Sequence, residues 1–294
     1  MKPAPFEYHA PSSAAEAARL LADLGDSAKL IAGGQSLVPV LAMRLAVFDH
    51  LIDIRRIGAL RGIEERGGLL WIGAATTEAE IGRSALVAAR VPLLARATPL
   101  IGHFQIRNRG TIGGSLAHAD AAAEYPAVAL ALDATIEARS PRGQRTIPAA
   151  GFFTGIWSTA LEPDEVLTGV TFPVAAAHRA GFAIEEFARR PGDFAVAGAA
   201  VAVDLDNDGT AISRCRIGLF GLGPTPLRAA AAEATAVGAP ARSPLTPAEL
   251  GRAAVADLES VPSDLHGSAS YRKRVGAALV AAAVSRAIEE ALHG

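Results

Sequence analysis

The chain has 294 residues, a formal net charge of −2 and a single cysteine. Half of its residues are hydrophobic and a fifth are charged, which is typical of a globular protein long enough for two or three domains. Its basic residues are scattered, which argues against nucleic-acid binding, and no apolar run reaches the ~18 residues that a membrane span needs. The lone Cys215 excludes an intrachain disulfide and a thiolate-held cluster on this chain alone. Residues 1–6 lack the apolar core of a secretory signal, so we expect a cytoplasmic protein.

The N-terminal segment has the pattern of a small α/β unit. A capping box that begins at Ser13 predicts a helix ending near Gly25. Residues 29–32 predict a strand that runs into Gly33-Gly34, and residues 48–54 predict another strand. We therefore expect a parallel sheet with a glycine loop at the carboxyl end of one strand, where open α/β sheets bind ligands.

The middle of the chain predicts hairpins and short helices. A strand is expected at residues 69–73, a helix capped by Thr77 follows it, and residues 91–101 have a helical pattern. A hairpin is expected over residues 135–148, and another strand over residues 166–173.

Two diglycine segments carry the strongest signal. Gly33-Gly34 precedes Gln35 and Ser36, whereas Gly113-Gly114 lies between Thr111-Ile112 and Ser115. Both are interpreted as tight turns whose N–H groups are unshielded by side chains and can hold a phosphate. A single Gly-Gly usually marks only a turn, but two such loops together predict that the chain binds the two ends of a pyrophosphate-containing cofactor.

The C-terminal part predicts an α+β domain built from strands followed by helices. The expected strands are residues 182–189, 195–205 and 211–222, and the expected helices are residues 229–236, 247–258 and 268–292.

Other motifs are weak. The segment Asp204–Gly209 matches the start of a calcium-binding loop, but position twelve is Cys215 instead of Glu, so a polar hairpin turn is the better interpretation. Gly218–Gly223 lacks the spacing of a dinucleotide fingerprint. No catalytic residue and no metal site is therefore predicted.

Five stretches together carry a family resemblance, namely residues 32–39, 43–46, 103–120, 189–194 and 264–272. With these motifs, the chain resembles the FAD-binding medium subunit of the molybdenum hydroxylases, a family that includes carbon monoxide dehydrogenase and the multi-subunit xanthine-dehydrogenase-like enzymes. The resemblance covers almost the whole chain.

This resemblance implies an α+β fold in which a two-subdomain PCMH-type FAD-binding domain precedes a C-terminal domain. We expect the first domain at residues 1–177, with subdomains at about 1–55 and 56–177. The C-terminal domain, like that of the carbon monoxide dehydrogenase flavoprotein, is expected at residues 178–294 as an antiparallel sheet plus helices.

FAD is the implied cofactor. The resemblance places Glu124 on the ribityl hydroxyls and Phe194 against the isoalloxazine ring, and the glycine amides are expected on the pyrophosphate. The full set of expected cofactor-binding residues is Ala32, Gly33, Gly34, Gln35, Ser36, Leu37, Ile101, Thr111, Gly113, Gly114, Ser115, Glu124 and Phe194. Because the flavin itself carries the redox chemistry, no catalytic acid or nucleophile is needed on the chain.

The implied function is electron transfer inside a larger enzyme. A large partner subunit would carry the molybdenum cofactor, a small one the 2Fe-2S clusters, and FAD on this chain would pass electrons to an acceptor such as NAD or a quinone. The three different subunits are expected to form a trimer, and two such trimers are expected to form a heterohexamer. Ala42, Ala121 and Phe194 depart from the family pattern. Two alternatives remain: a stand-alone flavin oxidase or dehydrogenase, and a scaffold subunit that has lost FAD.

Overall fold

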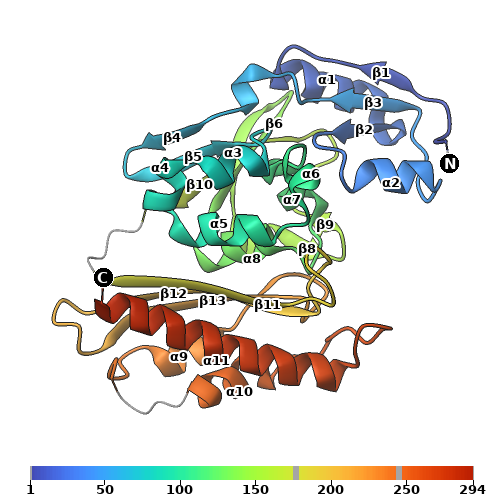
Figure 1. Cartoon of the computed structure of the whole chain (residues 1–294). Helices are drawn as coiled ribbons and strands as arrows, with labels where there is room; N and C mark the ends of the chain where they lie inside the picture. Colours follow the sequence, from blue (N-terminus) through green and yellow to red (C-terminus); the bar gives the residue numbers. More distant parts are fainter. Residues whose placement is uncertain (1, 175–178, 243–246, 294) are drawn as a thin grey trace.

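The computed structural model describes residues 2–174, 179–242 and 247–293. It contains a small N-terminal α/β unit, a middle unit built on an antiparallel sheet, and a C-terminal sheet with helices on both faces (Figure 1). The expected domain boundary at residues 177 and 178 lies outside the described residues.

The N-terminal unit is the predicted parallel sheet. Its strands have the order β1-β3-β2, and α1 packs against them. Ser13 caps α1 by accepting a hydrogen bond from the Glu16 amide, and Gly25 ends the helix with a φ of 57°. The elements are β1 (Glu7–His9), α1 (Ala14–Leu24), β2 (Ala28–Ile31), α2 (Leu37–Ala42) and β3 (His50–Asp53).

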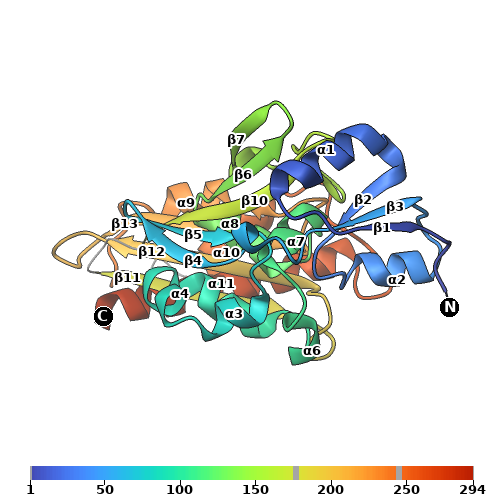
Figure 2. The same cartoon turned by 90° about the horizontal axis from the view of Figure 1, so that it is seen from above.

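The middle unit is a five-stranded antiparallel sheet of order β4-β5-β10-β6-β7. The β6–β7 hairpin projects from the body of the molecule (Figure 2). The strands are β4 (Ile63–Arg66), β5 (Leu69–Gly73), β6 (Thr135–Ser140), β7 (Gly143–Pro148) and β10 (Val166–Pro173), with a separate pair, β8 (Phe153–Gly155) and β9 (Ser158–Thr159). The helices are α3 (Glu78–Arg83), α4 (Ala85–Arg90), α5 (Pro92–Ala97), α6 (Phe104–Arg107), α7 (Ile112–His118) and α8 (Glu124–Ala131).

The C-terminal sheet lies between two helical layers (Figure 1). Small residues allow this, because a Cβ atom at Gly181 would overlap the Ala287 carbonyl oxygen on one face, and one at Gly218 would overlap the Ala127 carbonyl oxygen on the other. Its elements are β11 (Ala180–Phe187), β12 (Ala197–Leu205), β13 (Ile212–Phe220), β14 (Leu227–Arg228), α9 (Ala230–Ala236), α10 (Pro247–Ala256) and α11 (Ala269–His293). All three predicted strands and all three predicted helices are present.

The calcium-like segment forms the β12–β13 turn. Asp206 accepts hydrogen bonds from the amides of Thr210 and Ala211, at 2.7 and 3.2 Å, so its carboxylate stabilises the hairpin. The hairpin interpretation is confirmed.

Candidate functional site

The first diglycine segment is a bend between β2 and α2, as predicted. Gly33 is buried, and a Cβ atom there would overlap the main-chain carbonyl oxygen of Arg109. Gly34 has a φ of 75°, a conformation that side-chain-bearing residues rarely adopt. Both glycines are therefore required by backbone geometry at a point where two segments, distant in sequence, touch.

This bend leaves a run of free donors. Within the described part of the chain, no hydrogen bond is donated by the main-chain amides of residues 33–37. The Gln35 side-chain amide donates to the Gly33 carbonyl oxygen at 3.0 Å and braces the bend. Consecutive amides without acceptors form a concavity suited to an anion such as a phosphate group.

The second diglycine segment is not a turn, and that prediction is wrong. Gly113 and Gly114 lie in the first turn of α7, because Thr111 acts as the helix cap. The Thr111 hydroxyl accepts a hydrogen bond from the Gly114 amide at 3.1 Å, and the Gly113 amide donates to the Ala74 carbonyl oxygen at 2.9 Å. The amides of these two glycines already have acceptors within the protein.

Gly113 is required for packing. A Cβ atom there would lie 2.6 Å from the Cβ of Ala74, so only glycine lets α7 approach the end of β5 this closely. A Cβ atom at Gly114 would lie 3.7 Å from the Cβ of Ala32, which places the two diglycine segments side by side. The fold therefore brings together residues 32–34 and 111–115, as one pyrophosphate would require.

Ile101 lies in a loop that Arg107 organises. The Arg107 guanidinium donates to the carbonyl oxygens of Ile101 and Gly102, both at 2.8 Å, and to that of Pro99 at 3.3 Å. Arg107 therefore holds the backbone carbonyls of this loop in place.

Glu124 is a buried carboxyl group at the start of α8. It is the first residue of α8, is only 8% exposed, and in the described part of the chain its carboxyl group accepts no hydrogen bond from another residue. Burial, with smaller contributions from Glu186, Glu78 and Asp120, raises the pKa of Glu124 to about 8. The free chain therefore holds Glu124 protonated at neutral pH, ready for a polar ligand group.

Two further carboxyl groups with shifted pKa values carry no sequence signal: Glu78 is buried, and Glu186 is partly buried. Burial raises the pKa of Glu78 to about 7, against an opposing effect of Arg107, and burial likewise raises the pKa of Glu186 to about 7. The Oε2 atom of each is buried without a hydrogen-bond partner among the described residues. Glu78 follows a helix cap, where a carboxylate is normally solvated, so no local signal marks its burial.

The C-terminal domain reaches this region through its β11–β12 loop. Gly192 has a φ of 84°, and a Cβ atom there would lie 2.7 Å from Cε1 of His103. Phe194, two residues on, has 65% of its surface exposed. Its ring is therefore free to pack against a ligand, and its expected contact with the flavin stays a prediction.

The residues present fit FAD. The amides of residues 33–37, which have no acceptor among the described residues, suit the phosphates of FAD, and the bend at Gly33 has no room for a side chain. The buried carboxyl group of Glu124 accepts no hydrogen bond from another described residue and can therefore bind the hydroxyl groups of FAD.

Comparison with known proteins identifies the family of both parts of the chain. Residues 4–175 match the family described as "FAD binding domain in molybdopterin dehydrogenase", and residues 182–287 match "CO dehydrogenase flavoprotein C-terminal domain".

The chain is 44% identical over 293 residues to the 6-hydroxypseudooxynicotine dehydrogenase complex subunit alpha of Paenarthrobacter nicotinovorans, covering 100% of this chain and 96% of that one. It is 42% identical to the carbon monoxide dehydrogenase medium chain of Hydrogenophaga pseudoflava, with 98% of each covered. In a solved structure of carbon monoxide dehydrogenase from Hydrogenophaga pseudoflava, which lacks the Mo-pyranopterin moiety, the matching chain aligns with a TM-score of 0.95 at 43% identity and 99% coverage of both.

Fold and site thus define an α+β flavin-binding protein. The chain belongs to the family of FAD-containing medium subunits of the molybdenum hydroxylases, which are oxidoreductase subunits. Among the described residues, no helix is both long and apolar enough to cross a lipid bilayer.

Proposed function

We propose that residues 32–37 and 111–115 hold the pyrophosphate of FAD between them. The observation that carries this proposal is the run of unpaired amides in residues 33–37, set directly beside α7. Ser36 and Ser115 add hydroxyl groups, while Ala32, Leu37 and Ile101 supply apolar contacts. The glycines of α7 act chiefly by allowing close approach, since their own amides are occupied.

Glu124 orients the ribityl chain in this proposal. Ribityl hydroxyls that donate hydrogen bonds to its carboxylate favour the ionised form, so FAD binding lowers the pKa of Glu124 from about 8 and releases a proton. Phe194 packs near the isoalloxazine ring and has no polar group with which to hydrogen-bond it.

The redox chemistry is supplied by FAD when it is bound, and this chain binds and orients it. Relatives named as medium chains or complex subunits place the chain's homologues in multi-subunit enzymes. We infer that electrons arrive from the iron–sulfur clusters of a small partner subunit and leave to NAD or a quinone, in a cytoplasmic heterohexamer that includes a large molybdenum subunit.

The oxidised substrate is selected on another polypeptide in this proposal. Two relatives at 42% and 44% identity are named for carbon monoxide and for 6-hydroxypseudooxynicotine, which are chemically unlike. Because this chain is about equally similar to the subunits of two enzymes with such different substrates, we infer that these subunits supply a function common to both enzymes.

The test is the visible absorption spectrum of the full chain, alone and with its partner subunits, followed by identification of any released flavin. Stoichiometric FAD on the chain, with substrate-dependent bleaching only in the complex, is the expected result. Bleaching of the isolated chain by an organic substrate would favour the stand-alone oxidase. A colourless chain that does not take up added FAD would leave the scaffold alternative.

A further inference from the structure

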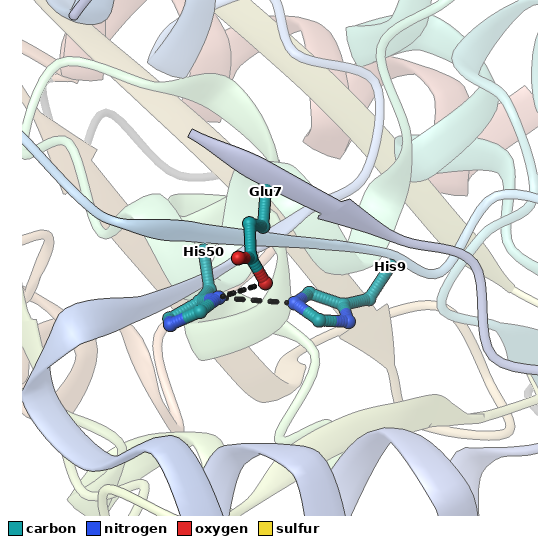
Figure 3. A group of neighbouring side chains, drawn as sticks. All are labelled: Glu7, His9 and His50. Atoms are coloured by element: carbon teal, nitrogen blue, oxygen red, sulfur yellow. Dashed lines mark hydrogen bonds and ion pairs between the residues drawn. The ribbon is translucent and has the colours of Figure 1, made fainter. Parts of the chain in front are cut away.

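Two histidines and a glutamate lie together on one face of the N-terminal sheet, although the sequence predicts no metal site there. Glu7 and His9 are two residues apart on β1, so their side chains share a face. His50 begins β3 and lies opposite Glu7 in the parallel register. Figure 3 shows the three side chains turned toward one another from these two strands.

The ligating atoms of this cluster lie close together. Nε2 of His9 is 3.1 Å from Nδ1 of His50, and Oε2 of Glu7 is 3.5 Å from the same Nδ1. One atom from each residue can be chosen so that all three lie within 4.8 Å of one another. The His50 side chain is 20% exposed, whereas that of Glu7 is 75% exposed, so the cluster is partly buried on the His50 side and open to solvent on the Glu7 side.

The two separations from Nδ1 of His50 are close to those between the ligands of a coordinated dication. With metal–nitrogen distances of about 2.0–2.1 Å, tetrahedral zinc holds its ligand atoms roughly 3.3 Å apart, between the two distances observed. Two imidazoles and one carboxylate suit zinc better than magnesium or calcium, which prefer oxygen ligands. We propose that Glu7, His9 and His50 bind one zinc ion, with solvent completing its coordination on the open side.

Zinc at this place joins β1 to β3. β1 has only three residues and lies at the edge of the sheet, and β3 is paired on its other side with β2, which leads into the bend at Gly33. Zinc therefore stabilises the strands that support the proposed cofactor loop, although no ligand of the ion belongs to that loop.

The experiment is a titration of the full chain, without a histidine tag and freed of metal by a chelator, with zinc chloride in a calorimeter. We expect one zinc per chain and a rise in Tm. His50→Ala and Glu7→Gln should each weaken binding at least about tenfold, as loss of even an indirect metal contact does. His266→Ala, which removes an exposed histidine of the C-terminal domain, should bind zinc as the parent chain does.

His9→Asn provides a second variant if His50→Ala does not fold, because His9 is the less central member of the cluster and Asn keeps a polar group there. Magnesium chloride at the same concentration should give no heat and no change in Tm. Zinc binding that is equal in the parent chain and in folded cluster variants, or a parent chain that binds no zinc, would overturn the proposal.

Discussion

The two diglycine segments are alike in sequence but have different roles in the structure. Gly33 and Gly34 form a bend whose neighbouring amides have no acceptor among the described residues. Gly113 and Gly114 open a capped helix, and their amides are already bonded. The same dipeptide thus offers donors to a ligand in one place and permits close helix packing in the other. The role of a glycine pair therefore cannot be assigned until the hydrogen-bond partners of its amides are known.

Gly33→Ala tests the ligand side of this comparison and should have the largest effect. Its methyl group overlaps the Arg109 backbone, which cannot move as a flexible side chain can, and forces the two segments apart. We expect FAD affinity to fall about 100-fold, near 2.7 kcal/mol. The measurement is FAD binding by flavin fluorescence. Gly58→Ala is the matched control, because nothing lies within 4 Å of its added Cβ.

Gly113→Ala tests the packing side. Its methyl group meets Ala74 at 2.6 Å and should cost about 2 kcal/mol of unfolding free energy even without FAD, as overpacking of a core does. Urea unfolding of the ligand-free chain measures this. Equal stability of this variant and the parent chain would contradict the assignment of Gly113 to packing.

Glu124→Gln should separate binding from stability. Loss of the carboxylate should weaken FAD binding about tenfold, since hydrogen bonds to a charged group contribute ~1.5–3 kcal/mol. The ligand-free chain should become more stable by roughly 1–2 kcal/mol at neutral pH. The reason is that Glu124 is ionised in the unfolded chain and must take up a proton when it is buried on folding, whereas Gln needs no proton. Weaker binding together with lower stability would indicate a purely structural role.

The pH dependence follows from the same carboxyl group. Its pKa is raised from 4.5 to about 8 in the folded chain, so between these values the folded state holds a proton that the unfolded state has released. The contribution of Glu124 to the stability of the ligand-free chain therefore falls as the pH rises toward 8. FAD affinity should rise with pH from 6 to 8, by up to about tenfold per unit, and Glu124→Gln should flatten this dependence.

Thr111→Val should give the smallest effect. It removes the cap that accepts a hydrogen bond from the Gly114 amide and should cost about 1 kcal/mol of stability. Ser84→Ala removes the comparable cap of α4, where the Ser84 hydroxyl accepts from the Val87 amide at 3.2 Å. Both variants should lower Tm, but only Thr111→Val should also weaken FAD binding in fluorescence titrations.

Most elements were predictable because their signals are local. Ser13 and Thr77 cap α1 and α3 as their spacing indicated, and strands such as β5, β10 and β12 follow apolar runs. Glu124 was selected through the family resemblance, and its burial agrees with that choice. Its raised pKa could not be foreseen, because the groups that surround it come from separate parts of the chain.

The α+β class, the family, most of the helices and strands and the positions of the two glycine segments could be predicted from the sequence, since periodicity, caps and motifs act over a few positions. Only the tertiary structure distinguished the amides of residues 33–37, which have no acceptor among the described residues, from the occupied amides in α7. It also left the Oε2 atoms of Glu78 and Glu186 without a hydrogen-bond partner and placed Glu7 and His9 beside His50. Hydrogen-bond partners, burial and ligand distances are properties of segments brought together by folding, and no single stretch of sequence contains them.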